Sequence, residues 1–157
     1  MLNGRTVGSK TLKNDCLARF SIPYESGTLE AVSYDAADHE IGRYKLQSAG
    51  GATSLTLDAE EPAAQTGHLC YVRLRYTDEN GITKPLMRGN IQVQVRGGTL
   101  VGLGSACPFN KHSYLDSETD TYYGEALAIV RMGDGDAMTI AASDGEYSAE
   151  LTVSAQA

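Results

Sequence analysis

The sequence has 157 residues, enough for one ordinary domain or two small ones and too few for a barrel enzyme. Hydrophobic residues make up 41% and charged residues 21%, close to globular averages, so we expect a folded chain with a buried core. The 13 Lys and Arg against 20 Asp and Glu give a net charge of −7, which disfavours nucleic acid as a partner because a phosphate backbone requires a basic face. No long apolar run opens the chain, so neither a signal peptide nor a membrane span is predicted.

Short alternating runs predict a nearly all-β chain. In the run from 70 to 76, Cys70, Val72, Leu74 and Tyr76 would share one face, as a half-buried strand requires. Turn signals rich in Asn, Asp and Gly separate the runs, as at 78–81, 133–136 and 144–145. We expect strands at about 15–22, 28–35, 40–48, 53–58, 68–77, 90–96, 99–103, 122–132, 137–143 and 147–154. So many short strands are typical of packed β-sheets.

A change in composition at residues 59–66, with adjacent acids, a proline and small residues, is interpreted as a linker. It divides residues 1–58 from residues 67–157, and only the second piece has the size of a complete β-sandwich, about 100 residues. Asn3-Gly4 is the strongest two-residue hairpin signal, yet almost nothing precedes it to form the incoming strand. We therefore interpret residues 1–58 as a truncated module whose first strand is missing, leaving a sheet edge that favours self-association.

The sequence predicts no metal and no cofactor. His39, His68 and His112 lie on three segments without metal-ligand spacing. The turn at 133–136 lacks the ligand pattern of a calcium loop. The glycine-rich run 96–105 has no following Gly-Lys-Ser/Thr, so it is interpreted as a tight strand connection and not as a phosphate loop.

The three cysteines Cys16, Cys70 and Cys107 lie far apart without a C-x-x-C pair, so no disulfide framework is expected. Unpaired cysteines favour a reducing cytoplasm over a periplasmic or secreted location.

The segment from 108 to 123 is longer than a hairpin loop requires and combines aromatic with acidic and amide side chains. Such rings could stack on sugars, or the loop could pack on its own sandwich or on a neighbouring domain. The candidate contact residues for a glycan or another domain are Phe109, His112, Tyr114, Tyr122 and Tyr123.

The stretches LNGRTVGSK, FSIPYESGTLEAVSYD and GRYKLQSAG resemble the small Ig-like module near the C-terminus of bacterial glycoside hydrolase family 2 enzymes, the β-galactosidase and β-glucuronidase relatives. The stretches YVRLRYTDENGITKP, NIQVQVRGGTLVGLGSACP and YYGEALAIVRMGDGDAMTIAASDG resemble the terminal Ig-like domain of the same family. Two departures stand out: Ser105 takes the place of a frequent Asn after the G-x-G turn, and the sequence begins inside the first module.

The resemblance implies an Ig-like β-sandwich region without catalytic residues, because the catalytic glutamates of the family belong to a barrel domain upstream. That catalytic barrel of the parent chain would be the partner. The acids of this sequence concentrate in turns and in the linker, where water keeps them ionised, and not in the paired arrangement of a retaining glycosidase. Two other interpretations remain open: an adhesin-type tandem of bacterial Ig-like repeats, and a carbohydrate-binding module that uses the tyrosine-rich loop.

Overall fold

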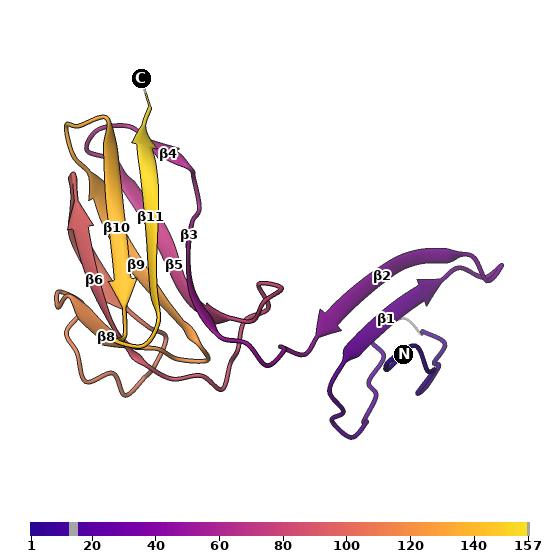
Figure 1. Ribbon diagram of the computed structural model, residues 1–157. Coiled ribbons are helices and arrows are strands. Elements are labelled where there is room, and N and C mark those ends of the chain that lie inside the picture. Colours follow the sequence, from indigo (N-terminus) through magenta and orange to yellow (C-terminus); the bar gives the residue numbers. More distant parts are fainter. Residues whose placement is uncertain (13–15, 157) are drawn as a thin grey trace. The chain divides into compact units, whose positions relative to one another are not determined.

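The computed structural model describes residues 1–12 and 16–156, and the chain divides into two units, Met1–Ser48 and Ala49–Ala157 (Figure 1). Every regular element of the described residues is a β-strand, which confirms the predicted all-β class. Within that part of the chain there is no helix of the length and hydropathy that a membrane span needs.

The second unit is a sandwich of two sheets. One sheet has four strands in the order β3-β5-β9-β7, and the other has five in the order β4-β11-β10-β6-β8. Lettering the main strands A to G in chain order, with the short strands β4 and β8 set aside, gives the sheets ABED and CFG of an immunoglobulin-like sandwich. The strands are β3 (Ser54–Ala59), β4 (Ala63–Ala64), β5 (Leu69–Thr77), β6 (Asn90–Arg96), β7 (Gly98–Gly104), β8 (Glu118–Asp120), β9 (Glu125–Met132), β10 (Ala137–Ser143) and β11 (Ser148–Ala155).

The core lies between the two sheets and is filled by alternate residues of their strands. On β5 the exposed fractions of Val72, Leu74 and Tyr76 are 0%, while Tyr71 and Arg73 face solvent. Central strands of both sheets contribute in the same way, so the predicted alternation sets which face of each strand is buried. The fully buried partners from the other strands include Ile91, Val130, Met138, Ile140 and Val153.

One buried polar group joins the two sheets. The hydroxyl of Tyr76 on β5 donates a hydrogen bond to Asp144, which lies in the turn between β10 and β11. The other carboxylate oxygen of Asp144 accepts the amides of Glu146 at 2.9 Å and Tyr147 at 2.7 Å. A buried hydroxyl without a partner would destabilise the core, so this turn satisfies the one polar atom that Tyr76 brings inside.

The run 96–105 is the tight connection that its glycines predict. Only Gly97 separates β6 in one sheet from β7 in the other, and its φ is +73°. A Cβ at this position would lie 2.4 Å from the carbonyl oxygen of Ala137. Glycine is therefore required both for the backbone conformation and for the close approach.

The first unit contains one antiparallel pair, β1 (Thr28–Tyr34) and β2 (Glu40–Gln47). The predicted turn at Asn3-Gly4 is present: both residues have positive φ, and the amide and carbonyl of Leu2 bond to those of Arg5 at 2.7 and 2.9 Å. Leu2 also pairs with Leu29, so the short arm before the turn lies along β1.

Two expectations about this part of the chain differ from the structure. The boundary between the units falls after Ser48, and the predicted linker at 59–66 instead includes the short strand β4 of the sandwich. The strand at 53–58, assigned by sequence to the first module, is β3 of the sandwich, because Leu55 and Leu57 pack into its core. The two adjacent acids and the proline fit a connection that crosses from one sheet of the sandwich to the other as well as they fit a linker.

The strand predicted at 15–22 is wrong for residues 16–22, and residue 15 lies outside the described residues. Cys16 has a φ of +51°, which is incompatible with an extended strand. The apolar side chains of this segment do not enter a core: Leu17 is 53% and Phe20 is 50% exposed. An apolar alternation without a sheet to pair with does not make a strand.

Replacing Leu74, which is 0% exposed, by alanine should lower the free energy of unfolding of the sandwich by about 2–5 kcal/mol, because it leaves a cavity between the sheets. The matched control is Leu86→Ala, at a leucine that is 93% exposed and should change stability by no more than about 0.5 kcal/mol. Urea unfolding followed by circular dichroism measures both. Equal effects of the two substitutions would contradict the assigned core.

Candidate functional site

The long loop between β7 and β8 holds three of the candidate contact residues, Phe109, His112 and Tyr114. The ring of Tyr114 lies against Gly104, where a Cβ would be 2.4 Å from it, and the carbonyl of Tyr114 accepts the amide of Leu103 at 2.8 Å. The side chain of His112 is 18% exposed, with Nδ1 at 3.4 Å from a carboxylate oxygen of Glu118. His112 and Tyr114 therefore hold the loop to the sandwich, whereas Phe109 is 86% exposed.

The other two candidates form a strained hairpin turn. Tyr123 and Gly124 both have positive φ, 52° and 76°, and Tyr122 and Glu125 exchange backbone hydrogen bonds of 2.9 and 3.2 Å. Tyrosine is unusual in this conformation and costs backbone strain. The rings of Tyr122 and Tyr123 meet edge to face with centroids 4.5 Å apart, and Tyr123 remains largely exposed.

These five residues fall into the loop between β7 and β8 and the hairpin turn that leads into β9. The two ring–ring contacts of the described residues are Tyr76 with Tyr147 and Tyr122 with Tyr123, so neither includes Phe109 or Tyr114. Binding of a glycan or of another domain by these residues stays a prediction.

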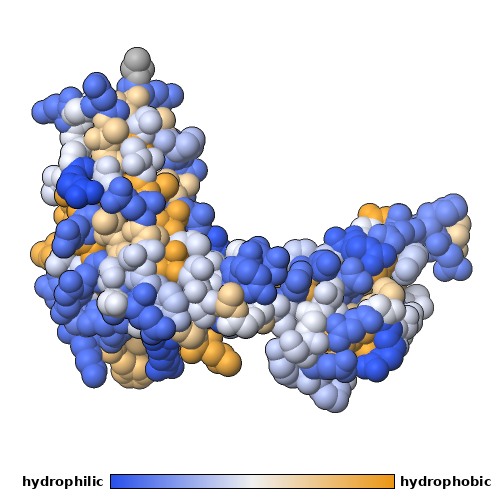
Figure 2. All heavy atoms as spheres, viewed as in Figure 1, coloured by the Kyte–Doolittle hydropathy of each residue, from blue (hydrophilic) through white to orange (hydrophobic). Residues whose placement is uncertain are grey.

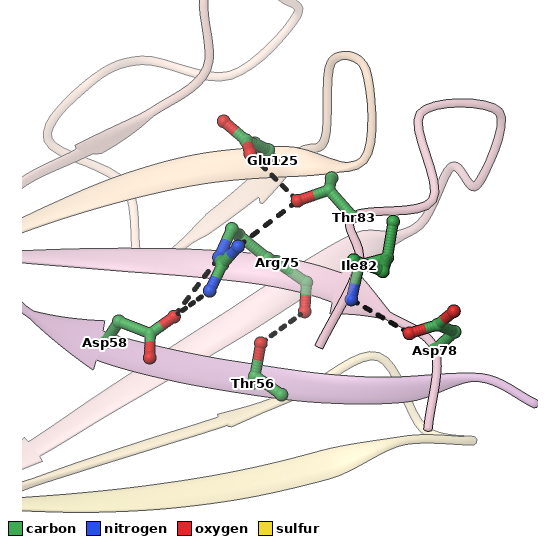
Figure 3. Close-up of polar contacts among 7 residues, drawn as sticks. All are labelled: Thr56, Asp58, Arg75, Asp78, Ile82, Thr83 and Glu125. Atoms are coloured by element: carbon green, nitrogen blue, oxygen red, sulfur yellow. Dashed lines mark hydrogen bonds and ion pairs between the residues drawn. The ribbon is translucent and has the colours of Figure 1, made fainter. Parts of the chain in front are cut away.

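The acids near the middle of the four-stranded sheet take part in a structural network around Arg75 of β5 (Figure 3). The guanidinium bonds to one carboxylate oxygen of Asp58 through Nε at 3.1 Å and Nη2 at 2.6 Å, and Nη1 donates to the hydroxyl of Thr83 at 3.2 Å. That hydroxyl in turn donates to Glu125 at 3.3 Å. The network ties β3 and β9 to β5, and it engages carboxylates that a hydrolase would need to keep free.

Another carboxylate, that of Asp78, orders the turn after β5. It is 4% exposed and accepts the amides of Asn80 and Ile82, both at 2.8 Å, and of Gly50 at 2.7 Å. These amides, that of Gly50 most strongly, hold the pKa of Asp78 below its usual range despite burial. Asp78, which follows β5, therefore holds Gly50 in the segment that leads into β3.

The described residues contain no group of three or more His, Cys, Asp and Glu that could hold a metal ion. Retaining glycosidases use two nearby carboxyl groups that are free to react. Asp58 and Glu125 do not form such a pair, because Asp58 is bonded to Arg75 and Glu125 to Thr83.

A cavity of about 380 Å³ lies at one end of the sandwich, away from the tyrosine-rich loop in sequence, and we call it the end pocket. Its lining comes from β4 and the connections on either side of it, the start of β5 and the residue after β11. Sequence reasoning missed it, because its residues carry no motif and are assembled only by the fold. They are Glu60, Glu61, Ala64, Gln65, His68, Leu69, Cys70, Tyr71 and Gln156.

The fold and these surfaces define an Ig-like β-sandwich region of accessory type. Residues 54–152 match the family profile "Glycoside hydrolase family 2 C-terminal domain 5", and residues 1–42 match a domain of unknown function, DUF4982. The chain therefore belongs to the C-terminal domains of glycoside hydrolase family 2, which confirms the resemblance seen in the sequence. No curated protein matches it.

Solved structures agree with this assignment. A family 2 glycosyl hydrolase from Bacteroides cellulosilyticus is 27% identical with a TM-score of 0.89, and the match covers 98% of this chain and 22% of that one. A β-glycosidase from Bacteroides vulgatus, 19% identical, shares the fold with a TM-score of 0.84 over 98% of this chain and 20% of its own. A family 2 β-glucuronidase, 18% identical, shares it with a TM-score of 0.74 over 86% of this chain and 15% of its own. The chain thus spans about a fifth of the length of these relatives.

The depressed pKa of Asp78 makes a pH dependence testable. Stability from its hydrogen-bonded carboxylate is fully present above the pKa of an unfolded aspartate, about 3.9, and is lost as pH falls through the lower folded pKa. Asp78→Asn should therefore be less stable at neutral pH and show a flatter decline on acidification below about pH 4. Urea midpoints measured from neutral to acid pH test this, with Asp134→Asn in an exposed turn as the control. Parallel curves for wild type and Asp78→Asn would contradict the role.

Proposed function

We propose that this chain is the non-catalytic C-terminal region of a longer bacterial family 2 β-glycosidase, of β-galactosidase or β-glucuronidase type, that degrades carbohydrate. The observation that carries the proposal is the family match over residues 54–152. The span of 22% of the related Bacteroides hydrolase supports placing the reacting carboxyl groups elsewhere, in a catalytic barrel of the same protein. In this role the sandwich is a structural support and shapes an interface with that barrel.

The surface of the first unit supports packing against another domain. The strand register places Leu29 beside Leu46 and Ala31 beside Tyr44 on one face of the β1–β2 pair. On this apolar face, Leu29 is 37%, Leu46 is 53% and Tyr44 is 69% exposed. Figure 2 shows hydrophobic residues among hydrophilic ones on the surface of this unit.

The opposite face of the same pair carries charged side chains beside Val32. Arg43 lies 3.2 Å from Glu30 and 2.8 Å from Glu40. A two-stranded sheet is marginal by itself in water and normally needs a further layer over its apolar side. We propose that the catalytic barrel of the parent protein supplies that layer.

We also propose a reducing, cytoplasmic location. Cys16, Cys70 and Cys107 are all free thiols, and Cys16 is exposed. A reducing compartment keeps such thiols unpaired.

The purified chain should show no turnover of nitrophenyl β-galactoside or nitrophenyl β-glucuronide, because the proposal places the reacting carboxyl groups outside it. A full-length family 2 enzyme assayed in parallel is the positive control. Hydrolysis that co-purifies with the folded chain through successive columns would refute the non-catalytic role.

The isolated chain should self-associate through β2. All eight residues of β2 are exposed, and among the described residues its only strand partner is β1, so its outer edge is open to pairing with a second copy. Sedimentation velocity over a concentration series should show dimers that Ile41→Lys weakens, since a charge at an edge opposes strand pairing. Leu86→Lys places the same charge on the sandwich and should leave association unchanged. A wild-type chain that stays monomeric at all concentrations would rule this out.

A further inference from the structure

The end pocket is preformed by backbone hydrogen bonds. The amide of Glu60 donates to the carbonyl of Tyr71 at 3.0 Å, that of His68 to Gln65 at 3.0 Å, and that of Gln156 to Ala64 at 2.9 Å. The three chain segments that line the pocket are thus fixed to the sandwich without using their side chains. The backbone of a binding site held in this way loses little freedom when a ligand enters.

The polar side chains of the end pocket are available to a ligand. No hydrogen bond or ion pair within the described residues engages the carboxylates of Glu60 and Glu61, the amides of Gln65 and Gln156, or the imidazole of His68. These residues are exposed, so the groups reach solvent. They surround a cavity of about 380 Å³, within the range of about 300–1,000 Å³ usual for small-ligand sites.

The apolar part of the lining contains one aromatic ring. Tyr71 is 39% exposed and stands with Leu69 on the outer side of β5, the side opposite to the buried Cys70. A ring of this kind offers a flat apolar face with a hydroxyl at its edge. One flat wall with several hydrogen-bonding groups around it matches a ligand that has an apolar face and many hydroxyls.

The charge of the end pocket selects among such ligands. Two carboxylates line it and no Lys or Arg does, so an anionic ligand would be repelled. Carboxylates accept charge-assisted hydrogen bonds from hydroxyl groups, and the amides can both donate and accept. A neutral sugar has an apolar face, many hydroxyl groups and no negative charge, so it fits the pocket on all three counts. A uronic acid carries a carboxylate and would be repelled.

We propose that the end pocket binds a neutral saccharide, with Tyr71 stacking on one sugar face and Glu60 and Glu61 accepting hydroxyl protons. This site is distinct from the tyrosine-rich loop. This proposal rests on the proposed function in one respect only: the carbohydrate that the parent enzyme degrades would be the source of the sugar. Failure of saccharide binding would leave the non-catalytic role intact, because that role is tested by hydrolysis.

The test is a titration of the full chain, by calorimetry and by NMR, with lactose, cellobiose and glucuronic acid. Lactose or cellobiose should bind and glucuronic acid should not. Tyr71→Ala should weaken binding of the neutral sugar about tenfold, the upper end of what one aromatic contact contributes. Tyr71→Phe keeps the ring and should retain most of the affinity, and circular dichroism confirms that each variant is folded.

Two matched variants separate this site from the alternatives. The double variant Glu60→Gln, Glu61→Gln should bind the neutral sugar several-fold more weakly and gain affinity for glucuronic acid, a change of selectivity that loss of structure would not produce. Tyr123→Ala should leave binding unchanged.

Three outcomes would overturn the proposal. The first is no binding of either neutral disaccharide up to its solubility limit. The second is loss of binding in Tyr123→Ala but not in Tyr71→Ala, which would place the sugar on the tyrosine-rich loop. The third is binding of n-butylamine in place of the neutral sugars, which would make the end pocket a cation site.

Discussion

The sandwich depends on one strand, β5, that must be apolar on one side and polar on the other. Its inner side fills the space between the sheets, and at its end Tyr76 carries a hydroxyl into that space, where Asp144 accepts its hydrogen bond. The bond connects a strand of one sheet to a turn of the other, so it fixes how the sheets meet. Burial, and then the hydrogen bond to Asp144, raise the pKa of Tyr76.

The outer side of the same strand explains why the charged groups of the sandwich have a structural role. Arg75 faces outward because its neighbours Leu74 and Tyr76 face inward, and this brings it to Asp58 and, through Thr83, to Glu125. Carboxylates used in this way stabilise the sheet and are not available as acid and nucleophile. At the end of the sandwich, by contrast, unengaged polar groups surround the end pocket.

Much of the fold was predictable because burial on a strand repeats every second residue. Two short strands were missed, β4 and β8, since two or three residues are too few to show a period. The candidate loop residues were chosen by type alone. The sequence could not indicate that Tyr114 would lie on Gly104 while Phe109 faced solvent, because those outcomes depend on the path of the loop.

By itself, the sequence determined the class of the fold, the inner face of β5, the turn at Asn3-Gly4 and the family. These features follow from local periodicity, turn chemistry and the order of motifs, which neighbouring residues carry. The tertiary structure alone decided where the units divide and which distant residues meet. Glu60, Tyr71 and Gln156 line one cavity only because β4 pairs with β11 while β3 pairs with β5. Side chains from three segments converge there through sheet pairing, which no local pattern in the sequence encodes.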